Sequence, residues 1–234
     1  MLLVSLGLVA APGALAWASH GSPPPDLGPN VIIFDPSMPT SQIQATVDAI
    51  AGQQISNQFG TERFALLFKP GTYGSAEQPL IVQVGYYTEV AGLGASPGDV
   101  VIIGHVDVYN QCGPGGCFAL VNFWRSLSNL TIQVTGLADC RASGNFWAVS
   151  QAAPMRRVDV VGPLTLMDYC TDGPQFASGG FIADSRTQGV VNGTLVFCDP
   201  RGSAHARAII ISHTGRPRVA RLDADGKPLR CLSG

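Results

Sequence analysis

Three aspartates in the central part of the sequence could take part in acid–base chemistry. Asp159, Asp168 and Asp184 each lie near the end of a short apolar run. Two carboxyl groups on either side of a bound sugar can serve as acid and as base or nucleophile, at a separation of roughly 5 to 9.5 Å. Stacking of the runs could bring two of the three together. The alternative is that they accept backbone N–H groups in turns. Other acids in this part are Asp99, Asp107, Asp139, Asp172, Glu77 and Glu89.

The basic and aromatic residues offer two further kinds of chemistry. Arg156 and Arg157 could supply the base of a lyase acting on a uronate, but no acidic cluster that would hold calcium precedes them. His105 stands alone among apolar residues, as a structural histidine does. We predict no metal site and no cofactor. Aromatic rings can stack on the C–H face of a pyranose, and the candidates are Tyr86, Tyr87, Trp124, Trp147 and Tyr169. Their alternative role is packing in the core.

The composition restricts the class of protein. Only 13% of the 234 residues are charged and the net charge is −2, which disfavours a disordered chain and a globally basic nucleic-acid binder. The 28 glycines and 17 prolines suit short strands joined by tight turns. Beyond the N-terminus no apolar stretch reaches the roughly 18 residues that a membrane span needs.

The N-terminus and the cysteines both indicate export. Residues 1–18 are predicted as a signal peptide because an apolar segment ends in Ala14-Leu15-Ala16, although it has no basic start and could instead be a buried strand or helix. Residues 19–30, rich in proline, follow as a linker. An even number of cysteines without a CxxC pair favours disulfides in an oxidising compartment. A Cys112–Cys117 bridge can close a small loop, and Cys140–Cys170 can then pair between coils.

The elements predicted from periodicity are one helix and many short strands. The spacing of Ile43, Val47 and Ile50 predicts a helix over Ser41–Ile50, with Thr40 or Ser41 as N-cap. Residues Lys69–Tyr73 read as a turn. The predicted strands are 65–68, 80–84, 87–91, 100–103, 118–121, 130–134, 146–149, 158–161, 164–167 and 180–183. Such spacing fits a β-sandwich or a parallel β-helix. The scarcity of NG and DG hairpin turns favours the β-helix.

Several segments resemble a known class of secreted protein. They are Phe64–Gly74, Tyr86–Gly104, Phe123–Ile132, Trp147–Leu166 and Ser178–Ser185. Over residues 31–191 the chain resembles bacterial pectin-lyase-like proteins, near the family-55 exo-β-1,3-glucanases. This resemblance implies an all-β fold, a right-handed parallel β-helix with an N-terminal cap helix, over residues 31–193. It also implies a surface that grips a glycan or carries a glycan-acting site.

The last forty residues differ in composition. They hold seven of the fourteen basic residues, and Ala206–Ser212 and Arg218–Leu222 read as an antiparallel hairpin, with a further turn at Asp225-Gly226. Residues 194–234 resemble the C-terminal part of minor pseudopilins of the GspH/FimT type, from type II secretion and type IV pili. The resemblance implies a small C-terminal antiparallel β appendage, a Cys198–Cys231 disulfide and contact of Arg216 and Arg218 with DNA. The pilin leader and its long apolar helix are missing.

These observations leave three functional hypotheses. The first is a secreted, periplasmic or extracellular β-helix protein that binds or processes polysaccharide, with glycoside hydrolase and polysaccharide lyase activity both open. The second is a pseudopilin-like component with secretion proteins, pilus proteins or DNA as partners. The third is a chimera of two genes without a native function.

Overall fold

The protein is described from a computed structural model over residues 26–172, 177, 180–187, 194–197, 205–211, 217–222 and 227–229. The predicted signal peptide 1–18, most of the linker 19–30, the Cys198–Cys231 pair and the Asp225-Gly226 turn lie outside these residues.

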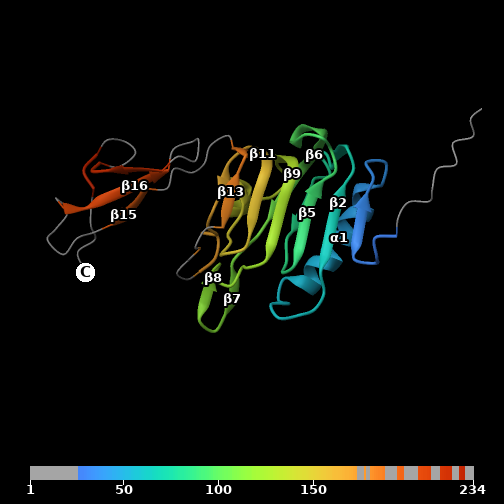
Figure 1. Ribbon diagram of the computed structural model, residues 1–234, viewed down its shortest axis with the longest axis horizontal. Helices are drawn as coiled ribbons and strands as arrows, with labels where there is room; N and C mark the ends of the chain where they lie inside the picture. The colour runs from blue at the N-terminus through green and yellow to red at the C-terminus, as the bar shows by residue number, and fades with distance from the viewer. Residues whose placement is uncertain are drawn as a thin grey trace, which may run out of the picture.

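Parallel strands stacked along one axis form the main body (Figure 1). One continuous series of hydrogen-bonded neighbours runs through β1 (Val31–Phe34), β2 (Phe64–Phe68), β5 (Thr88–Gly92), β9 (Arg125–Val134), β11 (Pro154–Val161) and β13 (Phe181–Ala183). All these pairings are parallel. The right-handed parallel β-helix predicted from the sequence is therefore confirmed, and the β-sandwich is excluded.

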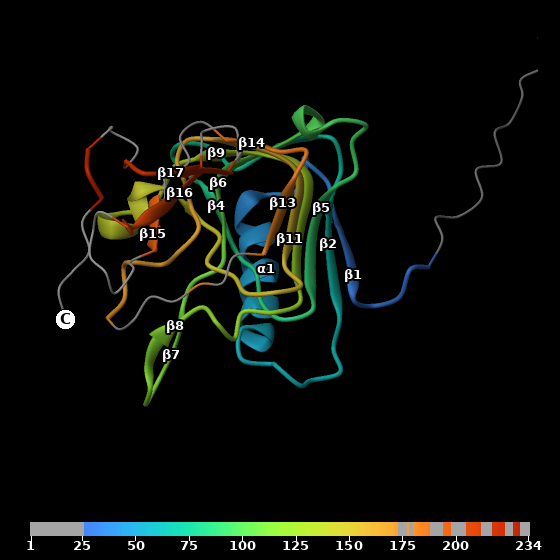
Figure 2. The ribbon, with the colours of Figure 1, turned by 60° about the vertical axis from the view of Figure 1, so that its left-hand side comes forward.

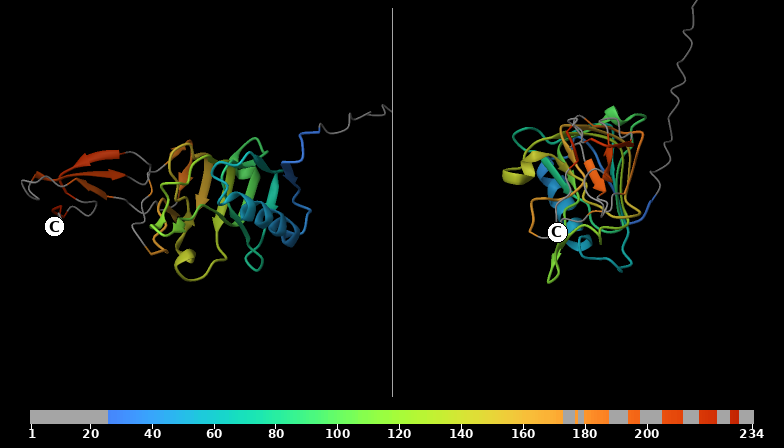
Figure 3. Two further views of the ribbon diagram at one scale, coloured as in Figure 1. Left: turned by 90° about the horizontal axis from the view of Figure 1, so that it is seen from below. Right: turned by 90° about the vertical axis from the view of Figure 1, so that its left-hand side faces the viewer.

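Two further series of hydrogen-bonded strands complete the coil, as the right-hand view of Figure 3, along the axis, shows. In one, β3 (Gly71–Tyr73) and β4 (Leu80–Gln83) both pair with β6 (Val100–Asp107), which pairs with the second half of β9. On its other side β9 pairs with β11, and β11 pairs with β14 (Arg186–Thr187). In the third series β10 (Asn145–Phe146) pairs with β12 (Leu164–Thr165). The single-turn helices η1 (Pro97–Asp99) and η2 (Asp139–Ser143) lie in the connections.

The core consists of like side chains aligned from coil to coil. In the first series Leu66, Val90, Leu127 and Met155 occupy one register position, and all four are buried. Side chains alternate across a strand, so their neighbours Glu89 and Ser126 point outward. Burial of one apolar face per strand is the main stabilising contribution to this stack.

The chain bends at two corners where residues adopt left-handed backbone conformations. Tyr87, Trp124 and Ala152 form one corner, each with φ near +54° and all at one register position, just before β5, β9 and β11. Asn129, Arg157 and Asp184 form the other corner, with φ from 51° to 55°. At the second corner the Asn129 side-chain amide donates to Gly92 O and Gly94 O, which satisfies carbonyls of the preceding coil.

The helix α1 (Thr40–Gln54) covers the core at the N-terminal end of the solenoid (Figure 2). Its buried face includes Ile43, Val47 and Ile50, as the spacing predicts. The amide of Gln44 pairs with the backbone of Ile81 on β4, donating to its O at 2.7 Å and accepting its N–H at 2.9 Å. A side chain thus replaces the neighbouring strand that β4 would otherwise need.

Several predicted boundaries were wrong. The helix is longer than Ser41–Ile50, and its N-cap is Pro39, without a side-chain cap, instead of Thr40 or Ser41. Gly71–Tyr73 is a short strand within the predicted turn. Of the predicted strand 118–121 only Phe118 is in a strand, at the end of the hairpin of β7 (Gln111–Gly113) with β8 (Gly116–Phe118). The predicted strands 146–149 and 164–167 contribute only Phe146 and Leu164–Thr165.

The remaining strands form a separate antiparallel sheet, β15 (Thr194–Phe197), β16 (Arg207–Ile211) and β17 (Pro217–Ala220). The β16–β17 pairing confirms the antiparallel hairpin, whereas β15 had no sequence prediction. The disulfides Cys112–Cys117 and Cys140–Cys170 are both present, as predicted.

Tyr73 links the first coil to the next. Its ionisation should lower the free energy of unfolding at alkaline pH. Its buried hydroxyl donates to the carbonyls of Phe34 and Lys69, at 3.0 and 2.8 Å. Burial, assisted by the nearby Asp35 carboxylate, raises the pKa of Tyr73 from 10.0 to about 12. Between these values the folded state retains a proton that the unfolded state loses, so stability falls as pH rises through this window.

We expect the free energy of unfolding of the native chain to decrease from pH 10 to pH 12 more steeply than that of Tyr73→Phe. Urea denaturation followed by circular dichroism at a series of pH values measures both slopes. The variant should also be about 1 kcal/mol less stable at neutral pH because two carbonyls lose their donor. Equal slopes would contradict the assignment.

Candidate functional site

A ladder of stacked side chains lies at the corner that precedes β2, β5 and β9. Arg63, Tyr87 and Trp124 occupy the same register position in three successive coils. The Arg63 guanidinium carbon lies 3.4 Å from the centroid of the Tyr87 ring. The rings of Tyr87 and Trp124 are stacked, with centroids 5.2 Å apart and planes 9° from parallel. Because each ring is held by the coil before it, the indole of Trp124 has a fixed orientation.

The ladder ends at Trp124 because the next coil supplies Ala152 at that position. Trp124 remains 39% exposed. A groove of about 360 Å³ opens here, lined by the ladder residues and, among others, by Glu89, Ser126, Ala152 and Pro154. An oriented aromatic ring beside a methyl-sized neighbour leaves one ring face open for a flat ligand to stack on.

Beneath the groove, Arg125 and Tyr86 support the corner from inside. The Arg125 side chain is buried, and its Nε donates to Val84 O at 2.9 Å. Its guanidinium carbon lies 4.3 Å from the centroid of the Tyr86 ring. Burial lowers the pKa of Arg125 to about 10. Arg125 therefore serves to hold the backbone of this corner, and its charge faces the interior.

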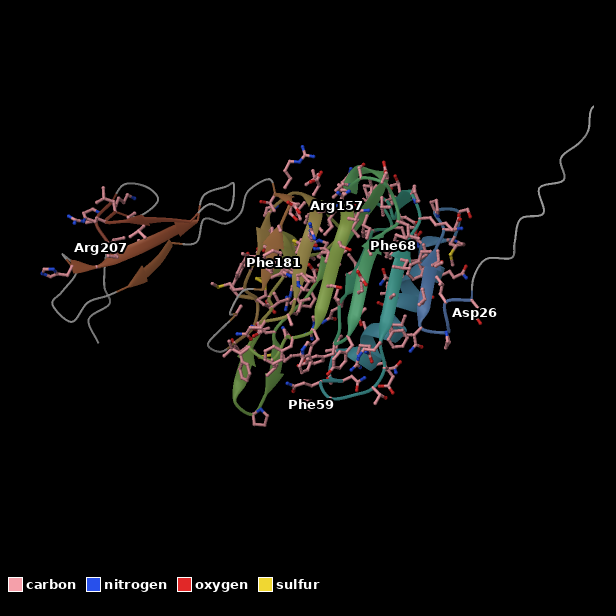
Figure 4. The ribbon with its side chains drawn as sticks, viewed as in Figure 1. Asp26, Phe59, Phe68, Arg157, Phe181 and Arg207 are labelled. Carbon is pink, nitrogen blue, oxygen red and sulfur yellow. A yellow bond between two sulfur atoms is a disulfide. The ribbon has the colours of Figure 1, made fainter. Side chains whose placement is uncertain are left out.

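Phe59 flanks the corner from the loop after α1. It is 84% exposed and makes an edge contact with Trp124, with centroids 6.5 Å apart. Figure 4 shows Phe59 below the lower ends of the strands, whereas Arg157, in the second corner, lies at their upper ends. The groove therefore lies at the Phe59 side of the sheet.

The structure separates the aromatic residues predicted to stack on sugar. Tyr87 and Trp124 come together in the groove. Tyr86 and Trp147 are buried, at 2% and 1% exposure, so neither ring offers a free face and the core-packing alternative holds for both. Tyr169 lies elsewhere, with its hydroxyl directed to Ser143 Oγ and its ring 5.6 Å from that of Phe146.

The predicted catalytic aspartates are each engaged by a different arginine. Asp159 Oδ2 lies 2.7 Å from Arg186 Nη2, and Asp184 Oδ2 lies 3.1 Å from Arg156 Nε. Asp159 and Asp184 thus form arginine–aspartate ion pairs between neighbouring coils, and an acid–base pair among the three aspartates stays a prediction. Arg156 is consequently paired, which does not suit a free lyase base.

Arg157, the other arginine considered as a lyase base, packs along the second corner. It donates from Nε to Asn129 Oδ1 at 3.1 Å and from Nη2 to Ala95 O at 2.9 Å. Both arginines therefore stabilise contacts between coils.

Asp168 belongs to a buried polar cluster on another side of the solenoid. Its Oδ2 lies 2.9 Å from Arg141 Nη2 and accepts the backbone N–H of Asn110 at 3.0 Å, while Oδ1 accepts the N–H of Cys170. The Cys140–Cys170 disulfide brings the two partners together, because Arg141 follows one cysteine and Asp168 precedes the other. The contacts are those of a structural anchor.

The same cluster continues to Tyr109, Asp107 and His105. The Arg141 guanidinium carbon lies 3.7 Å from the centroid of the Tyr109 ring, and the Tyr109 hydroxyl donates to Asp107 Oδ2. Burial, together with the Asp107 charge, raises the pKa of Tyr109. His105 Nδ1 lies 3.3 Å from Asp107 Oδ2, and His105 is fully buried. This location agrees with the structural role predicted for His105.

The sequence analysis did not identify Arg63, Ser126 or the bare position Ala152 as residues of the groove. It named Glu89 only in the set of central acids. The available signal was a bulky residue immediately before successive strands, Arg63 before Phe64, Tyr87 before Thr88 and Trp124 before Arg125. Reading that signal requires the register between coils.

The DNA contact of Arg216 and Arg218 stays a prediction. Arg216 lies outside the described residues, and for Arg218 only the backbone, within β17, is described. Among the described residues no cluster of three or more His, Cys, Asp or Glu side chains could hold a metal ion. Within the same residues, no helix is both long and apolar enough to cross a bilayer.

The fold and groove define a parallel β-helix protein with an aromatic corner site. No model of a known protein family matches the chain. The chain is 49% identical over 167 residues to an exo-beta-1,3-glucanase of Streptomyces sp. (strain SirexAA-E / ActE), which covers 71% of this chain. It spans only 25% of the length of that relative.

Solved structures show the same similarity. The structure of sacteLam55A from Streptomyces sp. SirexAA-E superposes with a TM-score of 0.59 and 32% identity, covering 83% of this chain and 44% of that one. A variant of sacteLam55A in complex with glucose superposes with a TM-score of 0.58 and 34% identity, covering 84% of this chain and 40% of that one. The chain is thus similar to part of a glucanase, and the resemblance to pseudopilins gains no support.

The buried position of Asp168 predicts a large effect on stability. We expect Asp168→Asn to lower the free energy of unfolding by about 2–3 kcal/mol, because Arg141 loses the carboxylate that neutralises it. Denaturant unfolding at neutral pH measures this change.

Asp159→Asn is the matched control, since its partner Arg186 is 86% exposed. It should change the same quantity by less than about 1 kcal/mol. Similar losses in the two variants would contradict a structural role specific to Asp168.

Proposed function

We propose that this chain binds β-1,3-glucan in the groove at Trp124, as part of extracellular polysaccharide processing. The observation that carries the proposal is the oriented indole of Trp124, stacked on Tyr87 on one face and adjacent to the bare Ala152 position on the other. A glucose ring placed on this free face would bury its C–H surface against the indole.

The similarity to an exo-beta-1,3-glucanase supports the choice of polysaccharide, and a variant of the similar sacteLam55A was solved with glucose. The groove at Trp124 and this similarity together support glucan binding by this chain.

The disulfides support a location outside the reducing cytosol. Cys112–Cys117 and Cys140–Cys170 both cross-link described parts of the solenoid. Such bonds form and persist mainly in oxidising compartments. A secreted or periplasmic protein would also be in the same compartment as an insoluble or polymeric glucan.

The stacking role of Trp124 has a direct test. We expect Trp124→Ala to weaken binding of laminarin, a soluble β-1,3-glucan, by about thirtyfold, which corresponds to ~2 kcal/mol. Affinity electrophoresis in gels containing laminarin gives the dissociation constants.

Tyr169→Ala is the control because Tyr169 is 40% exposed, close to the 39% of Trp124, and lies outside the groove. It should retain native binding. Loss of binding in Tyr169→Ala with retention in Trp124→Ala would move the site away from the groove, and absence of laminarin binding by the native chain would refute the function.

A further inference from the structure

One carboxylate faces the groove. Among the described residues that line it, Glu89, on β5, is the only acidic one. Parallel register places Glu89 between Ala65 and Ser126 in an outward-facing row. Its two neighbours in that row are short, so its side chain is exposed, and it lines the same groove as Trp124 from the coil of Tyr87.

Glu89 has no hydrogen-bonding or ion-pair partner within the described part of the chain, although two arginines line the same groove. The Arg63 guanidinium donates from Nη1 to Gly60 O and to Glu62 O, both at 2.9 Å, and lies over Tyr87. The Arg125 guanidinium is buried and donates to Val84 O and Phe123 O. Both cations are engaged elsewhere, so the carboxylate of Glu89 keeps its full capacity to accept hydrogen bonds.

A free carboxylate beside a stacking ring favours a neutral polyol. Its two oxygens offer about four acceptor positions and no donor, which matches the O–H groups around the rim of a hexose. Hydrogen bonds to a charged acceptor are roughly twice as strong as those between neutral groups. The same charge repels a carboxylate or sulfate on the ligand, most strongly where stacking has removed water.

We propose that Glu89 selects neutral glycans in this groove, accepting hydrogen bonds from hydroxyls of a glycan that stacks one sugar on Trp124 and extends along the groove, and excluding uronic acids and other anionic sugars. This inference rests on the proposed glucan binding at the same site. It adds a property that stacking alone does not confer, since an aromatic face accepts neutral and anionic pyranoses alike.

The experiment compares two ligands with the same linkage, laminarin and a carboxymethylated β-1,3-glucan, by affinity electrophoresis at one low ionic strength. The native chain should bind laminarin at least tenfold more tightly than the carboxymethylated glucan. Glu89→Gln keeps the size of the side chain and removes its charge. It should weaken laminarin binding about fivefold and reduce the preference to less than threefold.

Glu77→Gln is the matched control, because Glu77 is exposed, lies outside the groove and changes the net charge equally. It should keep the native preference. Glu89→Asp, which retains the charge on a shorter side chain, should keep the preference while binding both glucans more weakly.

The outcomes separate the two proposals. Trp124-dependent laminarin binding with an unchanged preference in Glu89→Gln would overturn the role of Glu89 and leave the glucan site standing. An equal loss of preference in Glu77→Gln would overturn it too, because the effect would then come from net charge. Failure of the native chain to bind laminarin would remove the proposed function and this inference together.

Discussion

Parallel pairing of successive coils in constant register is the constraint on which the other features depend. It places Leu66 above Val90 and Val90 above Leu127 in the core, and it places Arg63, Tyr87 and Trp124 in one column outside. The same hydrogen bonds therefore build the core and the groove. Residues separated by more than twenty positions in the chain become neighbours because each coil repeats the bends of the one before it.

Polar groups serve two opposite purposes in this fold. Asp168, Arg141 and Tyr109 are buried and joined to one another or to the backbone, which fixes the connections on one side of the solenoid. Glu89 is exposed and without a partner among the described residues. A buried charge must be neutralised to avoid a large desolvation cost, whereas an exposed carboxylate can remain available for a ligand.

The groove lies within a few neighbouring coils, from the loop before β2 to the start of β11. Its shape arises from a difference between coils, since two of them supply a large ring at the corner and the next supplies a methyl group. A solenoid can thus acquire a binding surface by changing one position in the repeat while the inward-facing residues keep the stack intact.

The sequence by itself determined the fold class, the amphipathic helix, the two disulfides described in the structure and the candidacy of Tyr87 and Trp124. These follow from local composition, spacing and resemblance. Only the tertiary structure decided that Tyr86 and Trp147 are buried, that the three aspartates bind arginines, and that Glu89 shares the groove with Trp124. Those outcomes depend on register between coils, and a shift of one residue would exchange the inner and outer faces of every strand.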